Sequence, residues 1–381
     1  RPPRSTLFPS TTLFRSSNIF PEGEMTNSDA ITFLSEYQGW FRIRDNMNLT
    51  AGLLQNSSHI TSLFYGNHNA LNAAAYLQID ISPIERLTIV SGTRMEYNEL
   101  NNIAADLVPL FRGGLNYRVR NQTFLRASWG QGYRHPSIAE KFAATALGAV
   151  RIFPSIGLQP EKGWNAEVGI KHGILTRSLN GLVDLAFFYT QNKDLIEYTF
   201  GLYPDPLTGV SESGFRAENT EYSRVYGMEI EFNVSQSMGR FKNSLNGGYV
   251  FTFPAEFNPL TNRNTDEYLK YRRKHSITLN LGSSFESINI GLSLFFKSPV
   301  LAIDDVFLNE ATRERILPGF YDYWNVNNNS YLTGDFYLAY TFSQNYTVSL
   351  AVKNFTNTEY MSRPGYIQPQ RHFSLRVSGV F

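Results

Sequence analysis

The residue types that most often do chemistry are scattered in this sequence. None of its six histidines has the spacing to another histidine or to a carboxylate that metal ligands show; they are His59, His68, His135, His172, His275 and His372. Cysteine is absent, which excludes disulfides and thiolate metal sites. No serine–histidine or aspartate–histidine pair is evident. We therefore expect no catalytic residue, no metal site and no cofactor.

Aromatic side chains concentrate in one segment, where they could contact a ligand. The stretch PGFYDYWNVNNN contains four of them, Phe320, Tyr321, Tyr323 and Trp324. Rings of this kind stack on sugars and on other flat molecules. The alternative, which the sequence favours, is that they pack within a loop or join an aromatic belt at a membrane surface. Asp304 and Asp305 could hold a cation, although a solvated acidic patch explains them better.

The composition narrows the class of protein. The 381 residues carry a formal net charge of +1, which is too close to neutral to predict a nucleic-acid partner. No apolar run approaches the ~18 residues of a membrane-spanning helix. Aromatic residues nevertheless make up 14% of the chain, which suits strands that are apolar on one side only.

The dominant pattern is an alternation of apolar and polar residues with a period of two, which is typical of strands. In LFRGGLNYRVR, for example, Phe111 and Leu115 share one side while Arg112 and Arg118 share the other. About fifteen such segments follow one another, each near the ~10 residues of a membrane-spanning strand.

The connections between these segments alternate in length. Short turns are expected at 44–47, 82–85, 120–122, 174–178, 237–240, 285–288 and 343–345. Longer loops are expected at 59–70, 99–108, 134–162, 198–214, 255–267, 299–329 and 355–369. This rhythm predicts an antiparallel transmembrane β-barrel, with the short turns at one rim and the long loops at the other.

The barrel explains why charged residues occur within the strands. Its outer face must be apolar and its interior is wet, so charges can lie inside at little cost. We expect this position for Arg112, Arg126, Glu167, Asp184, Glu229 and Glu231. A soluble β-sandwich would show the same alternation, but strands as long as VYGMEIEFNVSQS are unusual for one.

The N-terminal segment has an unusual sequence. TLFPSTTLFRS, residues 6–16, resembles the translation of a common sequencing adapter, TLFPYTTLFRS, from which only Ser10 differs. The alternative is a short native strand with a chance repeat. We expect residues 1–16 to be adapter-derived and residues 17–381 to be one partial barrel domain, whose exposed edges would be the segment 31–45 and the segment 370–381.

Two elements around the 134–162 loop resemble motifs of the TonB-dependent receptor family. In WGQGYRHPSIAEKF, Tyr133, Arg134, Pro136 and Ser137 match an aromatic-Arg-Ala-Pro-Ser element, with His135 in place of the small residue. In LQPEKGWNAEVGIKHG, the second element is matched by Leu158, Pro160, Glu161 and Trp164, although PSIG replaces its Asn-Pro.

Three further stretches match the same family in the same order. YGMEIEF resembles its Gly-x-Glu-x-Glu strand, VKNFTNTEY its Asn-Leu-Phe-Asp-x-x-Tyr hairpin, and PQRHF its Pro-Gly-Arg-x-Phe element, with Gln370 in place of glycine. Each motif is weak alone. Their order, together with the rhythm of strands and loops over nearly all of 30–381, makes the resemblance specific.

The resemblance implies a fold, a location and a function. Members have a barrel of twenty-two strands in the Gram-negative outer membrane, with a plug domain inside it, and the fifteen segments would be the last fifteen strands. They import scarce, bulky ligands, such as siderophores, cobalamin or glycans, with energy delivered by the TonB complex. On this view the chain is no enzyme, and it is a fragment that cannot transport by itself.

Its other partners would be the outer-membrane lipid, a small-molecule or oligosaccharide ligand, and the outer-membrane assembly machinery. That machinery would read the terminal strand through Phe373, Leu375, Val377 and Phe381.

Within this resemblance, Arg134 and His135 join the aromatic segment as candidate ligand contacts. Haem receptors of the family usually carry a histidine between the two motifs of the 134–162 loop. None occurs between Ser137 and Leu158, so haem uptake is disfavoured. A passive outer-membrane porin and a soluble β-sandwich binding protein remain alternatives.

The adapter interpretation is directly testable. We expect sequencing of the source locus to show that the codons for residues 6–16 do not adjoin the rest of the gene. Finding them continuous with the codon for Ser17 would refute the interpretation.

Overall fold

The structure, a computed structural model, describes residues 4–19, 25–147, 150–204, 209–219, 222–342 and 345–379. The chain divides into two compact units. The first comprises Arg1–Tyr117, Ala127–Ala166 and Thr190–Ser223, and the second comprises Arg118–Arg126, Glu167–Tyr189 and Arg224–Phe381. No helix in the described ranges is long and apolar enough to cross a membrane.

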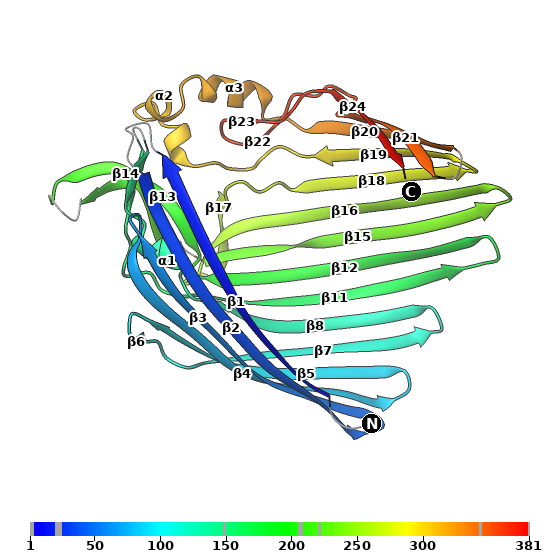
Figure 1. Cartoon of the computed structure of the whole chain (residues 1–381), viewed down its shortest axis with the longest axis horizontal. Coiled ribbons are helices and arrows are strands. Elements are labelled where there is room, and N and C mark those ends of the chain that lie inside the picture. The colour runs from blue at the N-terminus through cyan, green and yellow to red at the C-terminus, as the bar shows by residue number, and fades with distance from the viewer. Residues whose placement is uncertain are drawn as a thin grey trace. The chain divides into compact units, whose positions relative to one another are not determined.

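The first unit begins with a meander of long antiparallel strands, each paired with the next along the chain (Figure 1). The strands are β1 (Arg4–Ile19), β2 (Met25–Arg44), β3 (Met47–Ser62), β4 (Gly66–Ile84), β5 (Leu87–Leu100) and β7 (Val108–Arg120). The short β6 (Ile103–Ala104) pairs with the end of β5. Two further strands, β8 (Thr123–Arg134) and β11 (Glu161–Leu175), contribute residues to both units.

The second unit continues the same architecture. β15 (Tyr222–Met238) lies between β12 (Leu179–Lys193) and β16 (Phe241–Asn258), as Figure 1 shows. From β16 the antiparallel pairing runs through β18 (His275–Phe285), β19 (Ile288–Lys297), β20 (Tyr331–Phe342), β21 (Tyr346–Lys353) and β24 (His372–Gly379). Apart from β1 and the strands within the long connections, the described residues form fifteen strands, the number predicted, which confirms the antiparallel barrel class.

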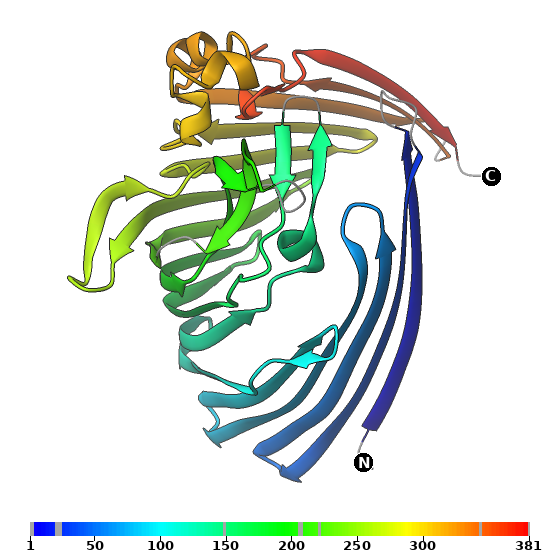
Figure 2. The same ribbon diagram turned by 90° about the vertical axis from the view of Figure 1, so that its left-hand side faces the viewer.

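The long connections contain the smaller elements. In the first unit, β9 (Thr145–Leu147), β10 (Val150–Phe153), β13 (Ile196–Pro204) and β14 (Ser211–Asn219) form a separate small sheet, seen in Figure 2, and α1 (Ile138–Phe142) precedes it. In the second unit, the loops hold β17 (Arg263–Tyr268), η1 (Asp305–Phe307), α2 (Arg313–Ile316), α3 (Phe320–Asn327), β22 (Met361–Arg363) and β23 (Tyr366–Ile367).

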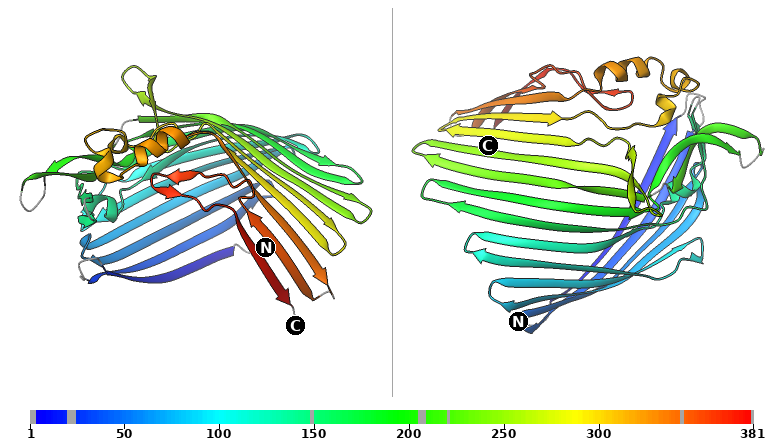
Figure 3. Two further views of the ribbon diagram at one scale, coloured as in Figure 1. Left: turned by 90° about the horizontal axis from the view of Figure 1, so that it is seen from above. Right: turned by 180° about the vertical axis from the view of Figure 1, so that it is seen from behind.

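Within each unit, neighbouring short turns are joined by backbone hydrogen bonds. In the first unit the Ser82 N–H donates to the Asn46 carbonyl at 2.8 Å. In the second unit the same kind of bond joins Ser237 to Ser178 at 3.0 Å and Thr341 to Ser287 at 2.9 Å. Seen from behind, the short turns of the second unit lie at one end of its strands and the helices η1, α2 and α3 at the other (Figure 3). The predicted separation of short turns from long loops is therefore confirmed in this unit.

The register gives each sheet one apolar face. In the first unit Tyr37 lies opposite Leu53, and Ile89 lies opposite Leu115. The apolar face of the second unit contains the paired residues Leu292, Phe336, Leu338, Leu350 and Leu375. Many of these side chains are exposed, far more than a soluble monomer tolerates. The face is suited to contact with lipid.

Two aromatic rows border the apolar face of the second unit. At the short turns, Phe241 and Phe285 have ring centroids 4.5 Å apart, and Phe342 and Tyr346 are 5.6 Å apart. Near the long loops, the rings are Tyr189, Tyr226, Phe253 and Tyr268, with neighbouring centroids 5.1–6.3 Å apart. We call these the short-turn row and the long-loop row.

The spacing of the rows matches a membrane. Phe241 and Phe253 lie on the same strand, β16. The 12 residue steps between them cover roughly 40 Å along the strand, or roughly 28 Å along the membrane normal at the usual tilt of about 45°. Transmembrane barrels have an apolar band about 25 Å tall with aromatic girdles at both borders. The two rows therefore occupy the positions of those girdles.

The expectation that segment 31–45 forms an exposed edge is wrong. β1 pairs along β2 from Arg4↔Trp40 to Ile19↔Met25, and β3 pairs with the other side of β2. An unpaired strand edge accepts an extended segment through backbone groups alone, so the adapter-like stretch can occupy it whatever its origin. That residues 1–16 are non-native stays a prediction.

A glycine at the β15–β16 contact offers a test of this packing. A Cβ atom on Gly227 would lie 1.9 Å from the Phe251 carbonyl oxygen, whereas one on Gly248 would come no closer than 3.6 Å to any atom. We expect Gly227→Ala to lower the free energy of unfolding by about 1–3 kcal/mol or more, measured by denaturant titration in detergent micelles. Gly248→Ala is the matched control, and equal midpoints for the two variants would contradict the strand pairing.

Candidate functional site

Arg134, at the end of β8, is held by two carboxylates. Its Nε and Nη2 donate to the two oxygens of Glu161 at 2.6 Å each, and its Nη1 donates to Glu140 at 2.9 Å. A guanidinium that binds a carboxylate with two parallel bonds is fixed in direction as well as in place. The side chain therefore joins the end of β8, helix α1 and the start of β11 into one junction.

Helix α1 is attached to this junction by its cap. Ser137 Oγ accepts the Glu140 N–H at 3.2 Å, and the Glu140 carboxylate accepts the Ser137 N–H at 2.7 Å. This reciprocal capping box satisfies backbone donors at the start of the helix. Glu161 also accepts the N–H of Ile196 at 2.8 Å, which connects the first residue of β13. The two motifs of the 134–162 loop thus meet in space and fix how the loop leaves the sheet.

Electrostatics at the junction explain the charge states of its groups. Burial by itself raises the pKa of Glu140, but the Arg134 guanidinium and the Ser137 donors outweigh it, so the pKa lies below its usual range. Burial lowers the pKa of His135. The imidazole of His135 is therefore neutral at pH 7, and its half-buried ring brings no positive charge to a ligand. That Arg134 and His135 contact a ligand stays a prediction.

The aromatic segment forms the interior of its own loop. Phe320 is 5% exposed and packs with Val300 and Ile303. Its ring lies 5.4 Å from Phe307 and 5.8 Å from Trp324. Phe320 therefore packs within its loop, as the alternative to ligand stacking expected, and little of its surface is left for a ligand.

Other residues of helix α3 have more exposed positions. Tyr321 lies under the Arg313 guanidinium, 3.9 Å from the ring centroid. Burial, followed by the neighbouring Glu359 carboxylate, raises the pKa of Tyr323 to about 12, so its hydroxyl remains a donor at neutral pH. That Tyr321, Tyr323 and Trp324 bind a ligand stays a prediction.

The structure does not support a cation site at Asp304. Its carboxylate accepts a hydrogen bond from Tyr271 and pairs with Lys270 at 2.9 Å. Within the described ranges, no group of three or more His, Asp or Glu side chains is arranged to hold a metal.

Three of the predicted interior charges form one cluster in the second unit. Arg126 donates to Glu167 at 2.8 Å and also to Asp184, which lies 3.8 Å from Lys171. Residues Glu229 and Glu231 alternate with Met228 and Ile230 along β15, so they share the face opposite the apolar one. All these charges lie on the polar face of the sheet. That this face lines the interior of a barrel stays a prediction.

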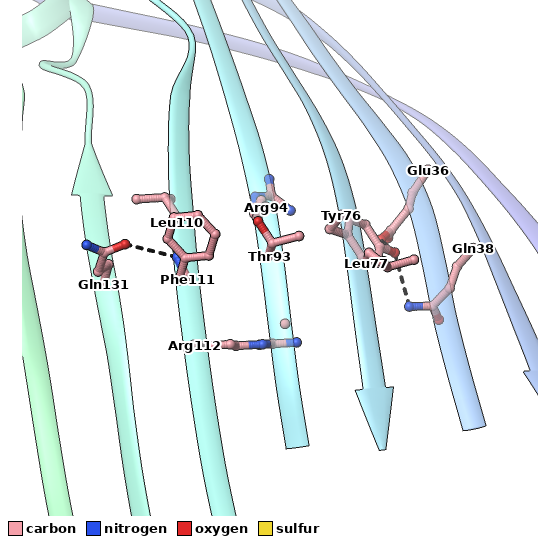
Figure 4. Close-up of a pocket in the computed structure, with 11 residues that line it drawn as sticks. Glu36, Gln38, Tyr76, Leu77, Thr93, Arg94, Leu110, Phe111, Arg112 and Gln131 are labelled. Carbon is pink, nitrogen blue, oxygen red and sulfur yellow. Dashed lines mark hydrogen bonds between the residues drawn. The ribbon is translucent and has the colours of Figure 1, made fainter. Parts of the chain in front are cut away.

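Arg112 belongs to a hollow of about 370 Å³ in the first unit (Figure 4). The Tyr76 hydroxyl donates to Glu36 at 2.6 Å and accepts the Gln38 amide at 3.0 Å, and the Arg94 guanidinium lies 5.8 Å from the Tyr76 ring centroid. Of these residues only Arg112 is predictable from the sequence pattern, because the others come from strands far apart in the chain. Their hydrogen-bonding groups line one part of this hollow, and Leu77, Leu110 and Phe111 line another.

A second junction lies beyond β21. Asn354, which is 6% exposed, has the left-handed backbone angle φ +47°. Its side chain accepts the Thr358 N–H at 3.1 Å and donates to the carbonyls of Thr358 and Pro369 at 2.9 and 3.2 Å. The motif VKNFTNTEY therefore holds the loop that leads into the last strand, which the resemblance alone could not show.

The proposed assembly residues lie on the apolar face of β24. Phe373, Leu375 and Val377 pair with Val352, Leu350 and Val348 of β21, and all three side chains are exposed. The terminal Phe381 lies outside the described residues. Recognition of this strand by the assembly machinery stays a prediction.

The sequence matches the family described as TonB dependent receptor-like, beta-barrel, over residues 5–355, and the chain belongs to that family. Members are transport receptors of the Gram-negative outer membrane. No curated protein matches the sequence.

Solved structures of the same fold are distant in sequence. The FrpB iron transporter from Neisseria meningitidis is 14% identical, with a TM-score of 0.70, over 98% of this chain and 60% of that one. The copper transporter OprC is also 14% identical, with a TM-score of 0.70, over 100% and 62%. A mutant of the ferric enterobactin receptor PfeA from Pseudomonas aeruginosa is 12% identical, with a TM-score of 0.71, over 99% and 59%. The chain thus spans about three fifths of their length.

The junction at Arg134 predicts a local pH effect. We expect Glu140→Gln to weaken both the ion pair and the cap, so that helix α1 opens about ten-fold more often, as a loss of about 1.5 kcal/mol would give. Amide hydrogen exchange of residues 138–142 at pH 7 measures this opening.

The direction of the pH effect follows from the pKa of Glu140. A carboxyl whose pKa is lowered on folding stabilises the fold above its ordinary pKa, about 4.3, and the stabilisation is lost as the pH falls through the folded value. Protection of α1, corrected for intrinsic exchange, should fall below about pH 4.5 in the unaltered protein but not in Glu140→Gln. Glu310→Gln is the charge-matched control, and an unchanged profile in Glu140→Gln would disprove the role of the pair.

Proposed function

We propose that this chain is part of an outer-membrane receptor that imports a scarce, bulky ligand with energy supplied through TonB. The family match over residues 5–355 is the observation that carries the proposal. Because the chain spans about 60% of similar structures, the proposal concerns the full-length protein.

The ligand class we propose is a metal chelate such as a ferric siderophore. Among similar folds are an iron transporter, a siderophore receptor from Acinetobacter baumannii and a copper transporter. A hemophore receptor from Serratia marcescens also shares the fold. Haem is the weaker choice for this chain, because no histidine lies between Ser137 and Leu158.

The long loops would supply the binding surface. Helix α3 rests on the core formed by Val300, Ile303 and Phe320, which fixes the helix in one position. Tyr321 and Trp324 lie on this supported helix and would stack on the aromatic rings of a chelate. The buried residues position the helix, and the less buried rings make the contact.

Uptake experiments on the full-length protein test the proposal. In cells that lack the gene, we expect loss of uptake of one radiolabelled ferric chelate, restored by the intact gene only when TonB and the proton gradient are present. Uptake that continues with a proton uncoupler, or without TonB, would instead identify a passive porin.

The binding surface is tested separately. We expect Tyr321→Ala/Trp324→Ala to weaken binding of that chelate to purified protein about 10- to 100-fold, as the loss of two aromatic contacts would give. Val326→Ala, a 70% exposed position on the same helix, is the control. Unchanged affinity in the double variant would show that α3 is not part of the binding surface.

A further inference from the structure

Two cations flank the long-loop aromatic row of the second unit. The Arg224 guanidinium lies 5.9 Å from the ring centroid of Tyr189, and the Lys274 ammonium lies 5.3 Å from that of Phe253. Tyr226 stacks between these two rings, with centroids 6.3 Å from Tyr189 and 5.1 Å from Phe253. The cations and rings therefore form one continuous surface.

Arg224 and the rings of Tyr226 and Phe253 lie on the apolar face of the sheet, and Lys274, which precedes β18, contacts the Phe253 ring from the end of that strand. Tyr226 and Arg224 alternate with Gly227 and Val225 along β15, in register with Met228 and Ile230 rather than with Glu229. The height of this surface, roughly 28 Å from the short-turn row, places it at the border of the apolar band on the side of the long loops. In an outer-membrane barrel that border meets the headgroups of the outer leaflet.

Among the described residues, no carboxylate neutralises either cation. Arg224 donates to the amide oxygens of Asn262 at 2.7 Å and Asn264 at 3.2 Å, and Lys274 donates to the Tyr268 hydroxyl at 2.8 Å. All three partners are neutral, and no carboxylate of the described residues forms an ion pair with either cation. The exposed Asp266 and Glu267 on β17 pair with neither. Both side chains keep unused N–H donors.

The neighbouring basic residues behave differently. Lys270 pairs with Asp304 at 2.9 Å, and Arg273 donates to the carbonyls of Ser298 and Met361. These two side chains hold the loop around α3. Within the run KYRRKH, Lys270 and Arg273 therefore bind other groups of the protein, whereas Lys274 lies beside the aromatic row.

We propose that Arg224 and Lys274 bind the phosphate of an anionic lipid in the outer leaflet, with the long-loop row packed against the adjoining part of that lipid. A phosphate accepts charge-assisted hydrogen bonds from both cations, and aromatic side chains favour the headgroup level. The apolar face below the surface receives the acyl chains. The lipid would hold the β16–β17 hairpin, which carries Asn262 and Asn264, against the membrane border.

The test uses the full-length protein purified from outer membranes and exchanged into a neutral detergent. The probe is a phosphorylated glycolipid, compared with its enzymatically dephosphorylated form and with inorganic phosphate. Native mass spectrometry counts the lipids retained and gives their affinity. We expect retention of the phosphorylated form, weaker retention of the dephosphorylated form, and no displacement by inorganic phosphate at the same concentration.

Substitutions locate the site. We expect Arg224→Gln/Lys274→Gln to weaken retention about 30-fold, which corresponds to roughly 1 kcal/mol per cation. Arg224→Lys/Lys274→Arg keeps both charges and should retain the lipid. The control Arg177→Gln/Arg315→Gln removes two exposed cations elsewhere and should have no effect.

The outcomes are decisive in both directions. Equal retention by the unaltered protein and the double glutamine variant would overturn the proposal, as would equal binding of the dephosphorylated lipid. If the double variant does not fold, the single variant Lys274→Gln tests the site. Removing the Lys274 charge leaves the contacts of Arg224 with Asn262 and Asn264 in place. An unchanged affinity in that single variant would equally reject the site.

Discussion

The backbone hydrogen bonds between neighbouring strands are the constraint on which the rest of this structure depends. A strand that crosses hydrocarbon must place every N–H and C=O group against the next strand, because lipid offers no partner. That requirement fixes long antiparallel strands in register, as from β16 to β24. Once the register is fixed, alternate side chains face opposite sides, so one face can be apolar while Arg126, Glu167 and Asp184 meet on the other.

The same constraint explains why four of the five family motifs lie where a strand begins or ends. Backbone groups that leave the sheet lose their partners, and side chains must replace them. Arg134 and Glu161 join two strand ends around the capped helix α1, and Asn354 binds the backbone of the loop before β24. These residues act as joints that hold loops in place.

Basic side chains of the second unit have two kinds of surroundings. On the polar face and in the loops, Arg126 and Lys270 are paired with carboxylates. At the border of the sheet near the long loops, Arg224 and Lys274 lie against aromatic rings and neutral partners. A charge at the edge of a lipid-facing surface is stable when it reaches the headgroup level. If the proposed lipid site is correct, the side of the sheet decides whether a cation pairs with a carboxylate of the protein or with a phosphate of the membrane.

The sequence by itself determined the fifteen barrel strands and, in the second unit, the alternation of short turns and long loops, because alternation with a period of two is a local property that survives without knowledge of contacts. The family followed from the resemblance of its motifs. The predicted long loop at 59–70 is a short turn, since β3 continues to Ser62 and β4 begins at Gly66. The sequence also identified six of the charges on the polar face. Only the tertiary structure decided their partners. Arg134 and Glu161 are 27 residues apart and Arg126 and Asp184 are 58 apart, so their pairing depends on strand register. It also decided that Phe320 is a core residue, and that Arg224 and Lys274 share one aromatic row, since such contacts join segments that no local pattern relates.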